Sequence, residues 1–270
     1  MNIDKYIIVK PQENCGMCGY IWQTIRAIYH NPNRKYYIDF ENSIYKSRTN
    51  DNIWDYFFCQ PHTNTKPDVE NIDKEVGIIF DAESEFVWEA IKPNTTEEIQ
   101  KRRFIFSEII NKYCVLQPQI KSKVDLFVEK NFKNKKVLGV HFRGTDHPNK
   151  KHMSEYLQTI KEKLVNFDVL FVCSDEHERF RLAEVTFSKK VVSWDSIRSK
   201  TDSDVIPLHS HPTDMRYNRN NSFDYQYKIS EDVIIESFLM SNVDFLVCCS
   251  DSNVNFLSRA INPNLNSITL

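Results

Sequence analysis

The second half of the chain constrains the fold most, because short apolar runs alternate there with segments of helical periodicity. Runs with the length and β-branched content of strands occur at 137–142, 169–173, 191–194 and 244–249, followed by a last short run, SITL. Segments with apolar residues at helical spacing lie at 154–165, 176–186, 231–242 and 253–261. This alternation predicts βαβ units and a parallel sheet.

The first half predicts a second α/β layer. Strands are expected at 6–9, 36–40 and 77–80, and helices at 20–29, 97–116 and 120–132. The Gln117–Pro118 break between the last two helices is the candidate connection between an N-terminal domain, residues 1–118, and a C-terminal domain, residues 119–270. Polar stretches predict loops at 64–73 and 199–227.

The charge balance argues against a nucleic-acid-binding protein. The 35 Lys and Arg residues nearly match the 37 Asp and Glu residues, so the basic excess that attracts a phosphate backbone is missing. No apolar stretch reaches the 18 or so residues of a transmembrane helix, and the first residues lack the apolar centre of a signal peptide. We expect a cytoplasmic protein, with association at the inner membrane surface left open.

Cysteine usage points to reduced thiols. The count of seven is odd, and Cys173, Cys248 and Cys249 fall in predicted buried strands. Cys15 and Cys18 have the spacing of a metal or redox pair, but no second CxxC or HxxxH supplies the further ligands that zinc requires. We therefore predict no metal site.

The stretch VLGVHFRGTD, residues 137–146, begins as a strand and ends in a polar cluster. His141, Arg143 and Asp146 crowd around Gly144. In a parallel α/β sheet, ligands bind beyond the carboxyl ends of the strands, and an arginine there can hold a phosphate through two parallel hydrogen bonds. A strand that runs into an exposed polar turn is the alternative.

Two later strand ends carry polar residues as well. Ser174 and Asp175 follow one strand, and Ser250–Asn253 lies between another strand and a helix. Parallel strands place all three ends on one edge of the sheet, and a helix N-terminus suits a phosphate. For Ser252 alone, helix capping is the simpler role, and for Asp175 alone a turn role. Together the three ends predict a nucleotide-diphosphate site, although no GxGxxG or P-loop motif is present.

The three strand ends also carry a family resemblance. HFRGTD resembles the His-x-Arg-Arg-x-Asp motif of α1,6-fucosyltransferases and the corresponding motif of rhizobial nodulation fucosyltransferases and protein O-fucosyltransferases. FVCSDE is similar to their second strand-end motif, and EDVIIESFLMSNVDFLVCCSDSNV to their third. More loosely, CGMCGYIWQTIRAIYHNPNRKYYIDF is similar to their glycine-rich first loop and helix.

The resemblance implies a fold, a reaction and a donor. The fold is of the GT-B type, two Rossmann-like domains with the donor site in the interdomain cleft. The reaction inverts the anomeric centre without a metal ion. Arg143 matches the arginine that holds the β-phosphate of GDP-fucose, and His141 and Glu236 match positions near the guanine and ribose. The predicted donor-binding set comprises His141, Arg143, Gly16, Gly19, Ser174, Asp175, Glu236, Ser250, Ser252 and Asn253.

The chain departs from the family pattern on the acceptor side. Gly144 stands where the α1,6-type motif has its second arginine, and Lys151 falls where those enzymes have a proposed catalytic acid. We predict Arg143, Asp146 and Glu155 as catalytic residues, with His147 and His152 as further candidates for the general base. The acceptor is expected to be a glycan. A different nucleotide-sugar donor, or a catalytically silent nucleotide- or glycan-binding module, stays open.

Overall fold

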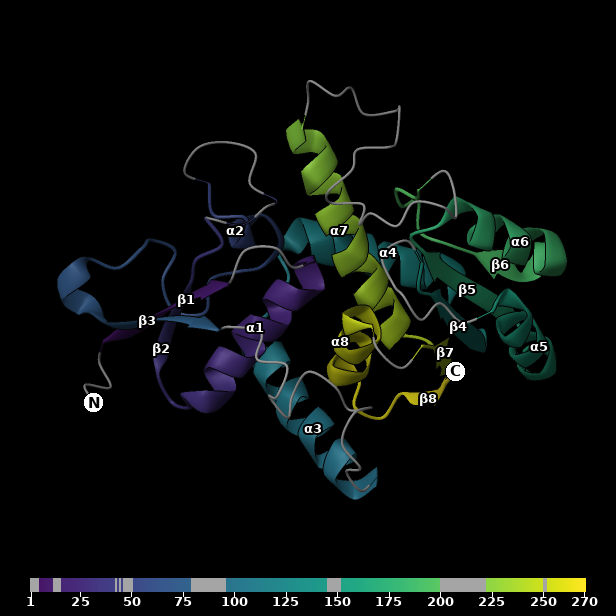
Figure 1. The fold of residues 1–270 in the computed structure, drawn as a ribbon, viewed down its shortest axis with the longest axis horizontal. Coiled ribbons are helices and arrows are strands. Elements are labelled where there is room, and N and C mark those ends of the chain that lie inside the picture. Colours follow the sequence, from purple (N-terminus) through teal and green to yellow (C-terminus); the bar gives the residue numbers. More distant parts are fainter. Residues whose placement is uncertain are drawn as a thin grey trace. The chain divides into compact units, whose positions relative to one another are not determined.

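A computed structural model describes most of the chain (Figure 1). The described residues are 5–11, 16–41, 43, 45, 51–78, 96–144, 152–199, 222–249 and 252–270. The chain divides into two compact units, Met1–Lys121 and Ser122–Leu270. No described helix is long and apolar enough to cross a lipid bilayer.

The N-terminal unit contains a parallel three-stranded sheet with the order β2-β1-β3. Its strands are β1 (Tyr6–Pro11), β2 (Lys35–Ile38) and β3 (Ile72–Ile78). Its helices are α1 (Met17–His30), α2 (Trp54–Phe57), the short 3₁₀ turn η1 (Val69–Asn71) and α3 (Thr96–Tyr113), and α4 (Pro118–Asn131) leads into the second unit. The middle residues of β1, Ile7, Ile8 and Val9, are all apolar and buried.

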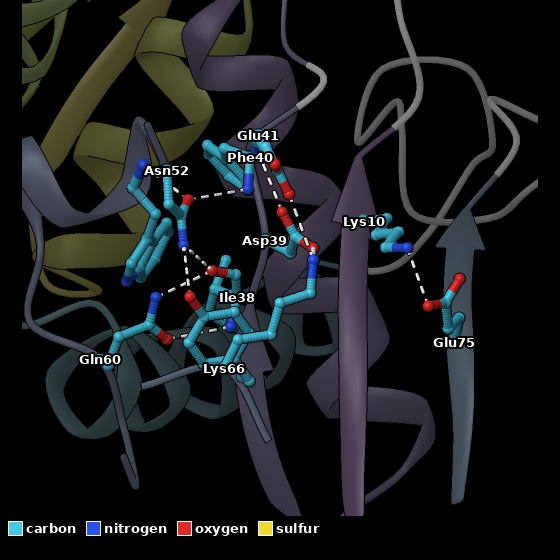
Figure 2. Close-up of polar contacts among 11 residues, drawn as sticks. Lys10, Ile38, Asp39, Phe40, Glu41, Asn52, Gln60, Lys66 and Glu75 are labelled. Carbon is cyan, nitrogen blue, oxygen red and sulfur yellow. Dashed lines mark hydrogen bonds and ion pairs between the residues drawn. The ribbon is translucent and has the colours of Figure 1, made fainter. Parts of the chain in front are cut away.

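Two side-chain amides cover the open edge of β2 (Figure 2). An edge strand exposes unpaired backbone groups. Gln60 accepts a hydrogen bond from the Ile38 N–H at 3.0 Å and donates one to the Ile38 carbonyl at 2.8 Å. Asn52 donates to the same carbonyl at 2.6 Å and accepts from the Phe40 N–H at 2.9 Å. The amides therefore take the place of a neighbouring strand.

The C-terminal unit contains a parallel five-stranded sheet with the order β6-β5-β4-β7-β8. Its strands are β4 (Val137–Phe142), β5 (Val169–Ser174), β6 (Val191–Val192), β7 (Phe245–Cys248) and β8 (Asn266–Thr269). Its helices are α5 (Met153–Lys163), α6 (His177–Phe187), α7 (Ser222–Ser241) and α8 (Asn253–Ile261), with 3₁₀ turns η2 (Leu164–Asn166) and η3 (Ser188–Lys190).

Helices cover both faces of this sheet (Figure 1), which explains the continuous burial of β4 and β5. On one face, strand residues such as Val140 and Val172 pack against Ile160 of α5. On the other face, the Phe171 ring contacts Phe127 of α4 at a centroid distance of 5.6 Å. The predicted parallel sheet of βαβ units is therefore confirmed.

The strand register determines where the polar strand ends lie. Phe142 of β4 is paired with Ser174 of β5, and Val140 is paired with Val247 of β7. Because β4 lies between β5 and β7 and all three run parallel, their carboxyl ends share one edge of the sheet. The segments that follow the three strands are neighbours, as the sequence predicted.

Two predicted boundaries in the N-terminal unit are wrong. Strand β3 begins at Ile72, inside the stretch 64–73 that we predicted as a loop. Its polar residues form cross-element ion pairs instead: Asp73 with Arg34 at 2.6 Å and Glu75 with Lys10 at 2.8 Å. Helix α1 begins at Met17, so Gly19 lies in its first turn and not in the predicted loop.

The predicted loop 199–227 is wrong at its end, because α7 begins at Ser222. Tyr225 and Ile229 are both buried, four residues apart on one helical face. The polar residues between them concealed this spacing. Six cysteines are described, and no disulfide joins them to one another: Cys18, Cys59, Cys114, Cys173, Cys248 and Cys249.

Candidate functional site

Arg143 and Gly144 leave β4 directly beside the turn that follows β5. Continuing the register from the Phe142–Ser174 pair places Arg143 next to Asp175. Its guanidinium Nη1 lies 3.9 Å from Asp175 Oδ2, within ion-pair range but beyond a hydrogen bond. Both side chains are partly exposed, 27% for Arg143 and 21% for Asp175. Arg143 is therefore held beside a carboxylate and can still reach solvent.

The turn after β5 is fixed on several sides. Glu176 is fully buried and forms an ion pair with Arg179, one helical turn later in α6. The Glu176 N–H donates to Ser174 Oγ at 3.1 Å. The Ser199 N–H donates to the Asp175 carbonyl at 2.7 Å, and Ser199 also pairs with Glu176 as a parallel bridge. A buried charge is costly unless it is paired, so this turn has a defined conformation.

His141 is the buried polar residue of β4. It is 6% exposed, and its Nδ1 atom has no hydrogen-bond partner among the described residues. Burial and the nearby Arg143 guanidinium lower the pKa of His141 to about 4, against the opposite effects of Asp175 and Asn255. The ring is therefore neutral at physiological pH.

Helix α8 begins at this edge with a serine that does not cap it. Ser252 occupies the N-cap position with extended backbone angles, but its side chain forms no capping hydrogen bond. The Ser252 side chain is buried, and its Oγ has no partner among the described residues. Asn255, in the first turn, instead fixes the end of β7 by donating to the Cys249 carbonyl at 3.1 Å. Helix N-termini carry partial positive charge and unpaired N–H groups.

Glu236, on α7, is buried and interacts electrostatically with Asp175. Ser196 donates a 2.7 Å hydrogen bond to its Oε1. Burial raises the pKa of Glu236 to about 7; Arg198 and the Ser196 hydrogen bond act in the opposite direction, and Asp232 and Asp175 reinforce the increase. The protonated form of Glu236, which burial favours, can donate a hydrogen bond as well as accept one.

A second carboxylate of α7 holds the segment after β6. Asp232 accepts hydrogen bonds from Trp194 Nε1 and from the Ile197 N–H, both at 2.9 Å. Burial raises the pKa of Asp232 despite its ion pair with Lys228. Arg198 lies over the Phe180 ring at 4.1 Å and donates to the Trp194 carbonyl at 3.1 Å. These contacts place Ser196 where it can bond Glu236.

The structure therefore brings part of the predicted site together. His141, Arg143 and Asp175 lie at adjacent strand ends and interact electrostatically, and Asp175 also acts on Glu236. Ser174 supports the turn after β5, and Ser252 and Asn253 begin α8. Asp146, His147, Lys151 and Ser250 lie outside the described residues.

The remaining predicted residues lie on other elements. Glu155 is exposed in the first turn of α5, and no described hydrogen bond or ion pair joins it to the strand ends. Gly16 is the N-cap of α1 in the N-terminal unit, and Gly19 lies in that helix. In the part of the chain that the structure describes, no group of three or more His, Cys, Asp or Glu side chains could hold a metal ion.

Several residues that build the site were missed from the sequence: Glu176, Arg179, Ser196, Arg198, Asp232 and Asn255. Asn255 had a readable signal, because an amide in the first turn after a polar strand end can reach back to the strand. The signal for Glu176 and Arg179 was their spacing of three at the start of a predicted helix. The roles of Ser196 and Asp232 depend on contacts between distant segments.

Comparison with solved structures places this arrangement in a known fold. The chain is similar to the NodZ α1,6-fucosyltransferase co-crystallised with GDP, with 13% identity, a TM-score of 0.51, and coverage of 95% of this chain and 92% of that one. The fold is that of these fucosyltransferases. An arginine-to-lysine mutant of Arabidopsis thaliana FUT1 in complex with GDP matches with 11% identity and a TM-score of 0.56 over 97% of this chain and 69% of that one. POFUT1 with GDP matches with 11% identity and a TM-score of 0.51 over 99% and 98%.

These likenesses are structural and not close in sequence. No family model matches the chain, and no curated protein matches it in sequence. The expected resemblance to the fucosyltransferase superfamily is confirmed at the level of the fold. So is the fold class, an α/β chain of the GT-B type with parallel, Rossmann-like sheets.

Proposed function

We propose that this chain is a glycosyltransferase that moves fucose from GDP-fucose to a hydroxyl group of a glycan acceptor. The observation that carries the proposal is the convergence of Arg143, His141 and the N-terminus of α8, whose Ser252 side chain forms no capping hydrogen bond, at one sheet edge. The fold is shared with NodZ, whose structure was also determined after soaking with GDP-fucose. In parallel α/β sheets, this edge is where nucleotides bind.

Among the described residues, a guanidinium and a helix N-terminus at this edge have the charge that suits a diphosphate. The Arg143 guanidinium can form paired, charge-assisted hydrogen bonds with a phosphate. The N-terminus of α8 adds partial positive charge, and Ser252 offers a hydroxyl that is not used for capping. We propose that Arg143 and Ser252 bind the β-phosphate, while His141 and Glu236 lie on the side of the nucleoside.

The proposed reaction follows from these assignments. The acceptor oxygen bonds to C1 of fucose, and the bond from C1 to the β-phosphate oxygen breaks. The electron pair of that bond leaves with GDP. Arg143 and the α8 N-terminus stabilise the negative charge as it develops, which is the usual role of preorganised cations and dipoles. We propose that this makes the reaction independent of a metal ion, and that direct attack inverts the anomeric centre.

The acceptor proton needs a base, which we propose to be Asp146 or Glu155. Asp146 follows Arg143 by three residues in the sequence. Glu155 is exposed in the first turn of α5, so solvent reaches its carboxylate. We further propose that residues 119–270 bind the donor and residues 1–118 contact the acceptor.

A donor panel tests the proposal. The chain is incubated with GDP-fucose, GDP-mannose or UDP-galactose, with and without a set of oligosaccharides, and nucleotide release and sugar transfer are measured. We expect GDP-fucose to be consumed fastest. Consumption of a different donor would favour another nucleotide-sugar transferase, and GDP binding without turnover of any donor would favour a silent binding module.

Substitution of Arg143 tests the assignment of the phosphate group. Arg143→Ala is expected to lower turnover of GDP-fucose by about 100-fold or more, since a lost charge-stabilising donor costs this much in comparable sites. Arg181→Ala is the matched control, because Arg181 is exposed on α6 of the same unit. If Arg143→Ala retained near-normal turnover, the assignment of Arg143 to the phosphate would be wrong.

A further inference from the structure

Gly144 has no room for a side chain. A Cβ atom at this position would lie 2.4 Å from Asp175 Oδ1, 2.4 Å from Glu176 Cγ and 2.6 Å from Glu176 Cδ. Carbon atoms in proteins do not approach this closely, because contact distances are about 3.5–4.0 Å. The α1,6-type motif has an arginine here, so this chain fills that position differently.

Glu176 supplies two of the three atoms that occupy the space beside Gly144. Its side chain is fully buried, and the ion pair with Arg179 keeps it from turning away. The bridge to Ser199 fixes its backbone on the side opposite Gly144. Because its side chain and its backbone are both held, Glu176 cannot move aside as a flexible surface side chain could.

The consequence concerns Arg143, the residue before Gly144. With Glu176 packed against Gly144 and Asp175 beside the guanidinium, the backbone after β4 is held at a fixed distance from the turn after β5. A side chain held by neighbouring packing loses less freedom when a ligand binds. We propose that Glu176 is a positioning residue, which holds Arg143 in place by occupying the space beside Gly144.

This inference rests on the proposed binding of a diphosphate by Arg143, and it makes shape rather than charge the property that matters. Glu176→Gln keeps the size of the side chain and an oxygen that can accept a hydrogen bond from Arg179, whereas Glu176→Ala removes both atoms of Glu176 that crowd Gly144. Gly144→Ala introduces the crowding directly. The matched control is Glu178→Ala, because Glu178 is an exposed glutamate in the first turn of α6.

The experiment measures the affinities for GDP and GMP by calorimetry in each variant. GMP lacks the β-phosphate, so the ratio of the two affinities reports the contact with Arg143. We expect Glu176→Ala and Gly144→Ala each to weaken GDP binding by about tenfold or more, as for a lost charge-assisted contact. GMP binding should change by less than about twofold, and Glu176→Gln and Glu178→Ala should keep the wild-type ratio.

The double variant Gly144→Ala/Glu176→Ala adds a second criterion. It removes the crowding by Glu176 and leaves only the contact with Asp175 Oδ1, so the double variant should recover part of the GDP affinity that Gly144→Ala alone loses. Equal losses for GDP and GMP, or an unchanged ratio in Gly144→Ala, would overturn the inference. If Glu176→Ala does not fold, Gly144→Ala and its comparison with Glu176→Gln decide. Failure of the wild-type chain to bind GDP would contradict the proposed function itself.

Discussion

Glu236 and His141 should make the free energy of unfolding depend on pH in opposite directions, so that their two effects largely cancel in the wild-type chain. Burial raises the pKa of Glu236 from 4.5 to about 7, and burial lowers the pKa of His141 from 6.5 to about 4. Each group is therefore predominantly neutral in the folded protein over a pH range in which it is charged in the unfolded chain. Replacing one of them should expose the pH dependence of the other.

The sign differs between the two groups. Between about pH 4.5 and 7, Glu236 binds more protons in the folded state, so its contribution to stability is complete below pH 4.5 and is lost as the pH rises. Between about pH 4 and 6.5, His141 binds fewer protons in the folded state, so its contribution is complete above pH 6.5 and is lost as the pH falls. Each shift corresponds to about 3 kcal/mol.

The assay is urea unfolding at a series of pH values between 4 and 8, with each variant compared with the wild-type chain. Relative to wild type, Glu236→Gln should become more stable by about 3 kcal/mol as the pH rises across this range, and His141→Gln less stable by a similar amount. Differences from wild type cancel the titration of all other groups, to the extent that the substitution leaves them unchanged. A difference for Glu236→Gln that does not vary with pH would refute the burial argument.

Two further predictions concern packing. Gly139→Ala should destabilise the C-terminal unit by about 1–3 kcal/mol, because the new Cβ would lie 2.8 Å from Val243 Cγ2, and adding Val243→Ala should recover part of the thermal midpoint. Gln60→Ala should lower the free energy of unfolding by about 1–2 kcal/mol, because the N–H and the carbonyl of Ile38 each lose a hydrogen-bond partner. The control is Gln158→Ala, since Gln158 is exposed. Equal thermal midpoints for the two variants would contradict the role of Gln60 in covering the edge of β2.

The C-terminal fold could be predicted because each of its signals was local. The run 169–173 is apolar throughout, the run 137–142 is apolar except at Gly139 and His141, and both became doubly covered central strands. The N-terminal unit was less readable. The start of β3 lies in a polar stretch, and its pairing with β1 and the ion pairs of Asp73 and Glu75 with Arg34 and Lys10 join residues far apart in the sequence.

The candidate site was predictable to the same extent. His141 lies at the end of β4, and Arg143 and Asp175 directly follow β4 and β5, so the parallel topology alone places them together. The residues that hold these side chains in place or alter their pKa values come from other segments of the chain. Ser196, which bonds Glu236, lies forty residues away in the sequence, and the crowding of Gly144 by Glu176 depends on side-chain packing between two strand ends.

A crystal structure of the chain with GDP bound would test the central proposal most directly. We predict that the β-phosphate contacts the Arg143 guanidinium and the Ser252 hydroxyl at the N-terminus of α8. We also predict that the nucleoside lies on the side of His141 and Glu236. A diphosphate bound elsewhere, or bound at this edge without contact to Arg143, would contradict the account.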